Sequence, residues 1–97
     1  MKLSVEEVLQ ATGGKLVGRA PGAQKLFESV TTDSRGALAG SLFVALKGER
    51  FDGHDFVNQA ATAGAAGVLV DHGEAPEGVA VVQVHDTLEA LGQLARH

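Results

Sequence analysis

The stretch LFVALKGERFDGHDFVNQAATAGAAGVLV, residues 42–70, decides the fold, because two apolar runs flank a helical pattern. Residues 42–46 form a near-continuous apolar run, which is typical of a strand buried on both faces. Small residues at helical spacing predict a helix over 55–63, and a second apolar strand follows at 67–70. A strand, a helix and a strand in this order predict a βαβ unit with parallel strands.

The elements on either side of this unit follow from capping signals and β-favouring side chains. Ser4 and Glu7 fit a capping box at the start of a helix. The predicted elements are a helix over 5–12, strands over 15–17, 26–32 and 79–84, a turn at 20–22, and a final helix capped by Asp86 or Thr87. The order predicts an α/β fold: a small mixed or parallel sheet with a βαβ unit and flanking helices.

Apolar spacing also predicts which helix faces are buried. The predicted faces are Phe56, Ala60 and Ala63 in the central helix, and Leu88, Leu91, Leu94 and Ala95 in the final helix. If the leucines of the final helix were exposed, they would form an apolar patch suited to docking another protein or domain. A non-enzymatic interaction module is therefore an alternative to a ligand-binding domain.

Length and composition narrow the class of protein. The chain has 97 residues, which is one small domain, and a formal net charge of −4. An acidic chain whose only aromatic residues are four Phe is a poor match for nucleic acid. The absence of cysteine excludes disulfides and thiolate metal sites and suits the cytoplasm. The apolar runs are shorter than the ~20 residues of a membrane span, and no signal peptide is indicated.

The first candidate binding segment is Thr31-Thr32-Asp33-Ser34-Arg35, where a strand gives way to a loop. Ligands of α/β sheets tend to lie beyond the carboxyl ends of strands. The hydroxyls of Thr32 and Ser34 suit a base or a sugar, and Arg35 suits an anion. The alternative is a simple Asx turn in which Arg35 pairs with Asp33.

The second candidate segment is the loop 48–53, which joins a predicted buried strand to a helix. Its glycines allow a close backbone approach, and free backbone N–H groups at a helix start favour an anion, to which Lys47 and Arg50 add positive charge. The alternative is a structural turn in which Asp52 or Asp55 caps the helix. Neither a G-x-x-x-x-G-K-[ST] nor a G-x-G-x-x-G motif occurs in the chain.

His54 stands between two aspartates and is a candidate metal ligand. The other histidines, His72, His85 and His97, lie at predicted turns or at the terminus and lack paired spacing. We therefore expect no metal site and assign His54 to packing or hydrogen bonding at the helix start. A stand-alone phosphate-binding enzyme is the weakest hypothesis, because no catalytic constellation is evident.

Residues 30–71, VTTDSRGALAGSLFVALKGERFDGHDFVNQAATAGAAGVLVD, closely resemble the N-terminal domain of Mur ligases. These are the ATP-dependent amide-forming enzymes of peptidoglycan precursor synthesis. The stretches 11–18 and 86–96 look most like the MurF type, which adds D-alanyl-D-alanine to UDP-N-acetylmuramoyl-tripeptide. The MurE type, which adds the third peptide residue, shares "DSR", "LFVAL.G" and "DGH.F" and is the alternative.

The resemblance implies that the chain is one domain of a larger ligase. Residues 1–84 would bind the UDP part of the UDP-linked muramoyl peptide. Residues 85–97 would form a helix leading to a central domain that binds ATP and Mg²⁺, and a third domain would contact the incoming group. The 97 residues alone would carry no cofactor and no catalytic residue. The implied partners are the substrate and the other two domains, with neither nucleic acid nor a membrane involved.

The resemblance also assigns roles by position. Ser34 would hydrogen-bond the uridine, and Thr32 and Asp33 would shape the pocket. Phe51 would cover the uracil face. Backbone amides near Gly53 and His54 would meet the diphosphate. The complete set of expected UDP-binding residues is Thr32, Asp33, Ser34, Arg35, Gly48, Arg50, Phe51, Gly53 and His54.

Overall fold

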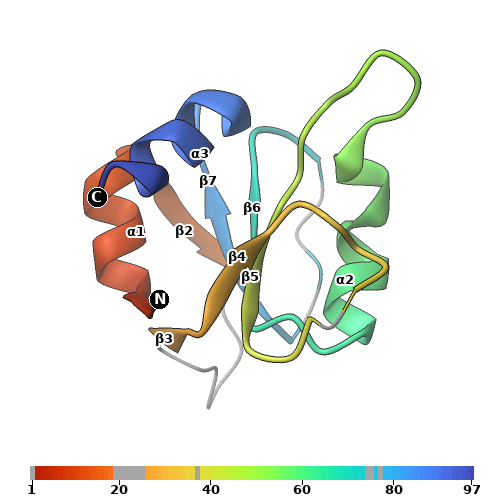
Figure 1. Ribbon diagram of the computed structural model, residues 1–97, viewed down its shortest axis with the longest axis horizontal. Helices are drawn as coiled ribbons and strands as arrows, with labels where there is room; N and C mark the ends of the chain where they lie inside the picture. Colours follow the sequence, from red (N-terminus) through yellow and green to blue (C-terminus); the bar gives the residue numbers. More distant parts are fainter. Residues whose placement is uncertain (1, 19–25, 37, 74–75, 77) are drawn as a thin grey trace.

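The computed structural model describes residues 2–18, 26–36, 38–73, 76 and 78–97, and it has three layers. Helices α1 (Val5–Thr12) and α3 (Thr87–Ala95) cover one face of a central sheet, and α2 (Val57–Thr62) covers the other (Figure 1). No helix within these described residues has the length and apolar character needed to cross a membrane. The predicted turn at 20–22 falls outside the described residues.

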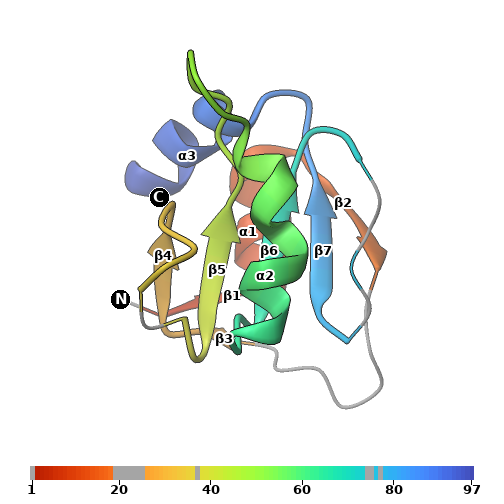
Figure 2. The ribbon, with the colours of Figure 1, turned by 90° about the vertical axis from the view of Figure 1, so that its right-hand side faces the viewer.

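The central sheet has five strands in the order β2-β7-β6-β5-β4 (Figure 2). The strands are β2 (Lys15–Gly18), β4 (Ser29–Thr31), β5 (Ser41–Val44), β6 (Gly67–Val70) and β7 (Ala80–Gln83). The four strands from β4 to β7 are parallel, and the edge strand β2 is antiparallel to β7. Because β5 and β6 are adjacent and parallel, the predicted βαβ unit and the mixed sheet are confirmed.

The prediction of one strand over 26–32 is wrong, because the chain changes partner within it. Strand β3 (Leu26–Phe27) pairs with β1 (Leu3–Ser4) in a separate two-stranded sheet. Strand β4 then pairs with β5, and the backbone N–H of Glu28 donates to the carbonyl of Gly40 at the switch. The residue types indicate that a segment prefers a strand, but they do not indicate which strand it pairs with. The sequence therefore does not predict the break between β3 and β4.

Strand β5 is buried on both faces, as its unbroken apolar character predicts. Leu42 and Val44 pack into the core under α1 and α3. Phe43 and Ala45 pack into a second core under α2. Successive side chains of a strand point to opposite faces, so this one strand joins the two cores.

The predicted helix over 55–63 begins earlier and in a different form. Residues Gly53–Phe56 form a 3-10 helix, η1, and the α-helix follows as α2. The buried residues of α2 are Val57 and Ala60, whereas the predicted Ala63 is exposed. The cause is the cap at Asp52, which starts the first turn two residues ahead of the predicted helix.

The final helix is capped as predicted, because the backbone N–H of Glu89 donates to Asp86 Oδ1 at 3.0 Å. Its predicted face is partly wrong. The buried residues are Thr87, Ala90 and Leu94, with Leu91 partly buried, while Ala95 is exposed and Leu88 is 67% exposed. Packing against α1 selects this face, so the leucines form no shared patch and the docking-module hypothesis loses its surface.

We predict that Gly67→Ala destabilises the fold. A Cβ at Gly67 would lie 2.7 Å from the ring of Phe27 and 3.0 Å from the carbonyl oxygen of Ala80. Overpacking of this kind costs about 1–3 kcal/mol, measurable by urea denaturation. The control is Gly92→Ala in α3, where a Cβ meets nothing within 4 Å and helix propensity favours alanine. Equal stability of the two variants would contradict the prediction.

Candidate functional site

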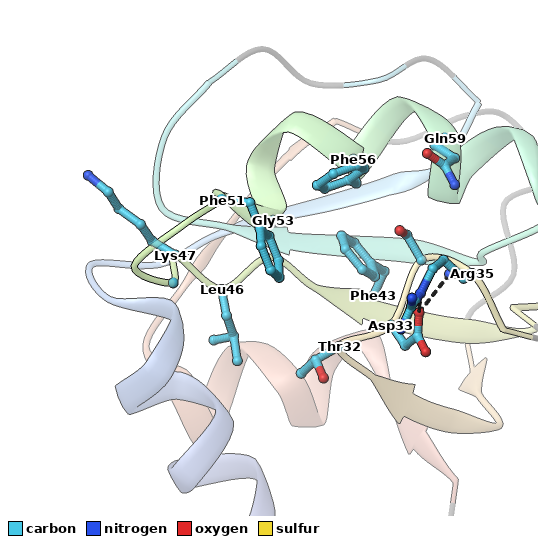
Figure 3. Close-up of a pocket in the computed structure, with 12 residues that line it drawn as sticks. Thr32, Asp33, Arg35, Phe43, Leu46, Lys47, Phe51, Gly53, Phe56 and Gln59 are labelled. Carbon is cyan, nitrogen blue, oxygen red and sulfur yellow. Dashed lines mark hydrogen bonds and ion pairs between the residues drawn. The ribbon is translucent and has the colours of Figure 1, made fainter.

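A groove lies at the edge of the sheet where β4 and β5 end (Figure 3). Both strands are parallel, so their carboxyl ends meet at this edge and the two candidate segments leave it side by side. The groove has a volume of about 870 Å³ and is lined by Thr32, Asp33, Ser34, Arg35, Phe43, Leu46, Lys47, Gly48, Phe51, Gly53, Phe56 and Gln59. The structure thus brings together all the predicted site residues except Arg50 and His54.

The segment after β4 is both a turn and a wall of the groove. Asp33 Oδ1 accepts the backbone N–H of Arg35 at 2.8 Å and the side-chain Nε–H of Arg35 at 3.1 Å. The first of these bonds, helped by the guanidinium, holds the pKa of Asp33 below its ordinary value, and the same pair raises the pKa of Arg35. The Asx turn at Asp33, which the sequence analysis gave as the alternative, is therefore present in the structure. Only Nε makes the ion pair and the side chain of Arg35 is 85% exposed, so the guanidinium remains accessible to an anion.

The loop after β5 folds tightly back on the strand through Gly53. The backbone N–H of Gly53 donates to the carbonyl of Leu46 at 2.7 Å. A Cβ on Gly53 would lie 2.7 Å from the backbone nitrogen of Leu46, so only glycine allows this approach. The N–H of Gly48 donates to the carbonyl of Phe51 at 2.8 Å and closes the tip of the loop.

The backbone amides of Gly53 and His54, which were expected to meet a diphosphate, both donate hydrogen bonds within the chain. The N–H of Gly53 is bonded to Leu46, and that of His54 donates to Asp52 Oδ1 at 2.9 Å. The N–H of Asp55 donates to the carbonyl of Asp52 at 3.0 Å. Asp52 is therefore the helix cap, and the donated N–H of His54 is the main cause that lowers the pKa of Asp52.

Three phenylalanines give the groove an aromatic character (Figure 3). Phe43 is buried, Phe56 is half-buried, and Phe51 is 64% exposed. The rings of Phe51 and Phe56 meet edge to face, with centroids 6.1 Å apart. Sequence reasoning identified Phe51 but assigned Phe56 to helix packing, because helical spacing does not show what lies beyond the end of a strand. An exposed ring beside hydroxyls and a guanidinium suits a flat, polar, anionic ligand.

Two predicted site residues, Arg50 and His54, do not line the groove, and the amine of the lining residue Lys47 extends away from it. Arg50 is exposed and does not line the groove. The side chain of His54 is 5% exposed and lies behind the loop, where its Nδ1 is 2.6 Å from Asp52 Oδ1 and its Nε2 accepts the N–H of Asp71 at 3.0 Å. Lys47 lines the groove, but its amine extends away from the aromatic rings (Figure 3).

The family of the chain is shown by comparison with known proteins. Residues 26–97 match the model described as "Mur ligase family, catalytic domain". The chain belongs to the Mur ligase family. The UDP-N-acetylmuramoyl-tripeptide–D-alanyl-D-alanine ligase of Bacillus subtilis is 44% identical over 98 residues, covering 99% of this chain and 21% of that relative. The UDP-N-acetylmuramoyl-L-alanyl-D-glutamate–2,6-diaminopimelate ligase of Aquifex aeolicus is 41% identical over 71 residues, covering 73% of this chain and 14% of that relative.

Solved structures agree with the sequence relatives. A crystal structure of MurF from Acinetobacter baumannii matches 97% of this chain and 20% of its own, with a TM-score of 0.85 and 39% identity. MurF from Thermotoga maritima in complex with ADP matches 70% of this chain and 16% of its own, with a TM-score of 0.64 and 32% identity. The chain therefore corresponds to the N-terminal domain of the MurF fold and spans about a fifth of its relatives' length.

We predict that Asp52→Ala destabilises the fold more than Asp55→Ala. Asp52 accepts the backbone N–H of His54 as the cap of η1, and loss of such a cap costs about 1 kcal/mol. Asp55 is exposed, and Asp55→Ala removes the same charge without removing the cap. This variant is therefore the matched control. Urea denaturation of both variants gives the comparison. Equal losses would show that charge, and not capping, sets the effect.

Proposed function

We propose that this chain binds the UDP part of a UDP-linked muramoyl peptide, as the substrate-recognition domain of a MurF-type ligase. The observation that carries the proposal is the groove, in which two segments from separate strands expose hydroxyls, a guanidinium and an aromatic ring side by side. A nucleoside diphosphate needs all three: hydrogen bonds for the uridine, positive charge for the diphosphate and a flat apolar surface for the base.

Each part of the ligand has a candidate partner in the groove. The hydroxyls of Thr32 and Ser34 bind the uridine, in a pocket shaped by Asp33. Phe51 covers the uracil, since its ring is exposed and is supported edge to face by Phe56. Arg35 is the anion partner, because its guanidinium is accessible whereas the amides of Gly53 and His54 are engaged within the chain.

The chemistry of the ligase lies outside these 97 residues in this proposal. The chain contains no G-x-x-x-x-G-K-[ST] motif, and ATP and Mg²⁺ belong to a central domain of the full-length protein. The complete enzyme joins D-alanyl-D-alanine to UDP-N-acetylmuramoyl-tripeptide in peptidoglycan synthesis, in the bacterial cytoplasm. Its central and C-terminal domains are the remaining partners of the chain.

The alternative is the same domain of a MurE-type ligase, supported by relatives such as the diaminopimelate ligase of Aquifex aeolicus. The relatives of the D-alanyl-D-alanine type from Bacillus subtilis and Haemophilus influenzae each cover 99% of the chain, whereas the diaminopimelate ligase of Aquifex aeolicus covers 73% of it. Assays of the full-length protein with D-alanyl-D-alanine and with diaminopimelate as acceptors distinguish the two types.

We predict that UDP binds the isolated chain weakly and perturbs only the groove. In a titration of ¹⁵N-labelled protein, amide shifts would be confined to 31–35, 47–54 and the neighbouring groove residues Phe43, Phe56 and Gln59. The shifts arise because the uracil ring and the diphosphate change the local magnetic and electrostatic environment. Shifts centred on α1 or α3, or none at millimolar UDP, would contradict the proposal.

We predict that Phe51→Ala weakens UDP binding at least about fivefold, because stacking of a base on an aromatic ring contributes about 1–3 kcal/mol. Leu88→Ala is the matched control, since Leu88 is an equally exposed apolar side chain on α3, outside the groove. Dissociation constants from the same NMR titration provide the measurement. A similar affinity for both variants would remove Phe51 from the site.

A further inference from the structure

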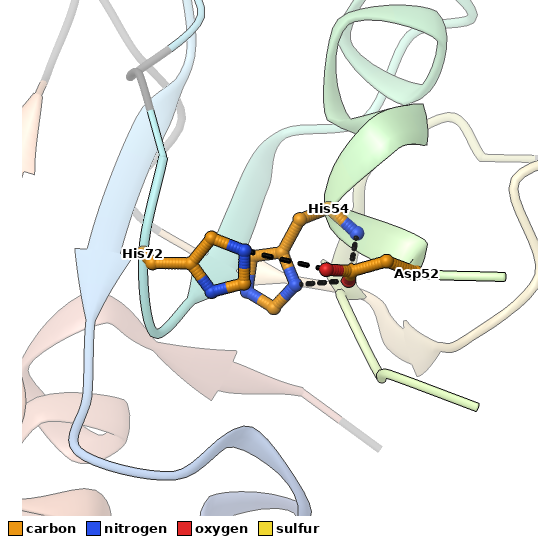
Figure 4. Close-up of side chains that lie close together, drawn as sticks. All are labelled: Asp52, His54 and His72. Atoms are coloured by element: carbon orange, nitrogen blue, oxygen red, sulfur yellow. Dashed lines mark hydrogen bonds and ion pairs between the residues drawn. The ribbon is translucent and has the colours of Figure 1, made fainter. Parts of the chain in front are cut away.

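Four titratable side chains meet behind the loop that forms the groove wall. Asp52 and His54 lie at the start of η1, and Asp71 and His72 follow directly after β6. The imidazole rings of His54 and His72 stack with centroids 3.8 Å apart and an angle of 23° between their planes. Figure 4 shows both rings directed at the Asp52 carboxylate, with His54 Nδ1 2.6 Å from Oδ1 and His72 Nε2 3.3 Å from Oδ2.

We propose that Asp52, His54 and His72 bind a divalent transition metal ion, with Zn²⁺ as the probe that fits best. One ligand atom from each of the three residues lies within 4.8 Å of the others. Two imidazole nitrogens and a carboxylate oxygen form a ligand set that Zn²⁺ uses commonly, with water in the remaining position. The stacked rings already present one nitrogen each to the same carboxylate, and coordination requires the two rings to turn out of their stack so that both nitrogens point at one ion.

Asp71 supplies the outer support that histidine ligands normally require. Its Oδ1 lies 3.1 Å from His54 Nε2 and 2.5 Å from His72 Nδ1. These are the nitrogens that face away from Asp52. A metal-bound imidazole usually donates its other N–H to a carboxylate, which orients the ring and raises its basicity. One carboxylate therefore supports both histidine ligands.

Metal binding requires a change of tautomer at His54. In the structure, Nε2 accepts the backbone N–H of Asp71 at 3.0 Å, so the ring proton is on Nδ1 and is donated to Asp52. Coordination by Nδ1 moves this proton to Nε2, where Asp71 Oδ1 accepts it. The backbone N–H of Asp71 loses its acceptor, and the metal bonds must offset that loss.

The burial of the cluster suits a site with one open side. The side chain of His54 is almost fully buried, those of Asp52 and Asp71 are half-buried, and that of His72 is 55% exposed. An ion can therefore enter and leave past His72. A bound ion would cross-link the start of η1 to the end of β6 and would fix the back of the loop that carries Phe51. The proposal does not depend on UDP being the ligand of the groove.

The test measures Zn²⁺ affinity of the tag-free chain by competition with a fluorescent chelator. We expect one Zn²⁺ per chain, and roughly 10- to 100-fold weaker binding in Asp71→Asn, which keeps the shape of the supporting side chain but removes its charge. His72→Ala should weaken binding at least as much, and the exposed position of His72 makes this variant compatible with folding. His85→Ala is the control, because His85 is exposed and lies outside the cluster.

A second readout reports coordination directly. Co²⁺ bound by two imidazoles and a carboxylate produces visible absorption bands, which His72→Ala should abolish and His85→Ala should retain. The proposal is overturned if wild type and His72→Ala bind Zn²⁺ with equal affinity, or if wild type binds none at submillimolar Zn²⁺. UDP titrations in the presence of a chelator keep the two proposals separate, because the groove can bind UDP whether or not the metal site exists.

Discussion

The parallel pairing of β4 with β5 is the constraint on which the groove depends. The register places Val30 opposite Leu42 and Thr31 opposite Phe43, so both strands end at the same edge of the sheet. Strand β5 is held between the two cores, which fixes that edge in position. The polar segments that leave the strands therefore start from rigid points, as ligand-binding loops of α/β sheets commonly do.

The contact between Gly53 and Leu46 has consequences for the chemistry of the groove. It folds the loop back on β5 and uses the amide of Gly53 in an internal hydrogen bond. The cap at Asp52 uses the amide of His54 in the same way. These two amides are therefore not free to bind a ligand of the groove. Arg35, on the other wall, offers an accessible positive charge for an anionic ligand.

The parts of the fold that were predicted correctly have local causes. The capping box of Ser4 and Glu7, the cap at Asp86 and the buried character of β5 each depend on residues within a few positions of one another. The errors involve choices between distant partners. The switch of pairing at Glu28 depends on which strand lies alongside, and the buried face of α3 depends on α1. Nothing in the local pattern distinguishes these outcomes.

The sequence by itself determined the α/β class, the βαβ unit, the family resemblance and the two segments that line the groove. Tertiary structure alone decided which atoms of those segments are available and which other side chains join them. Phe43 and Phe56 entered the groove, and His72 came to stack on His54, eighteen positions away along the chain. The physical reason is that periodicity and capping record contacts along one element. Contacts between elements arise only when strands pair and helices pack, which places residues distant in sequence within a few ångströms of each other.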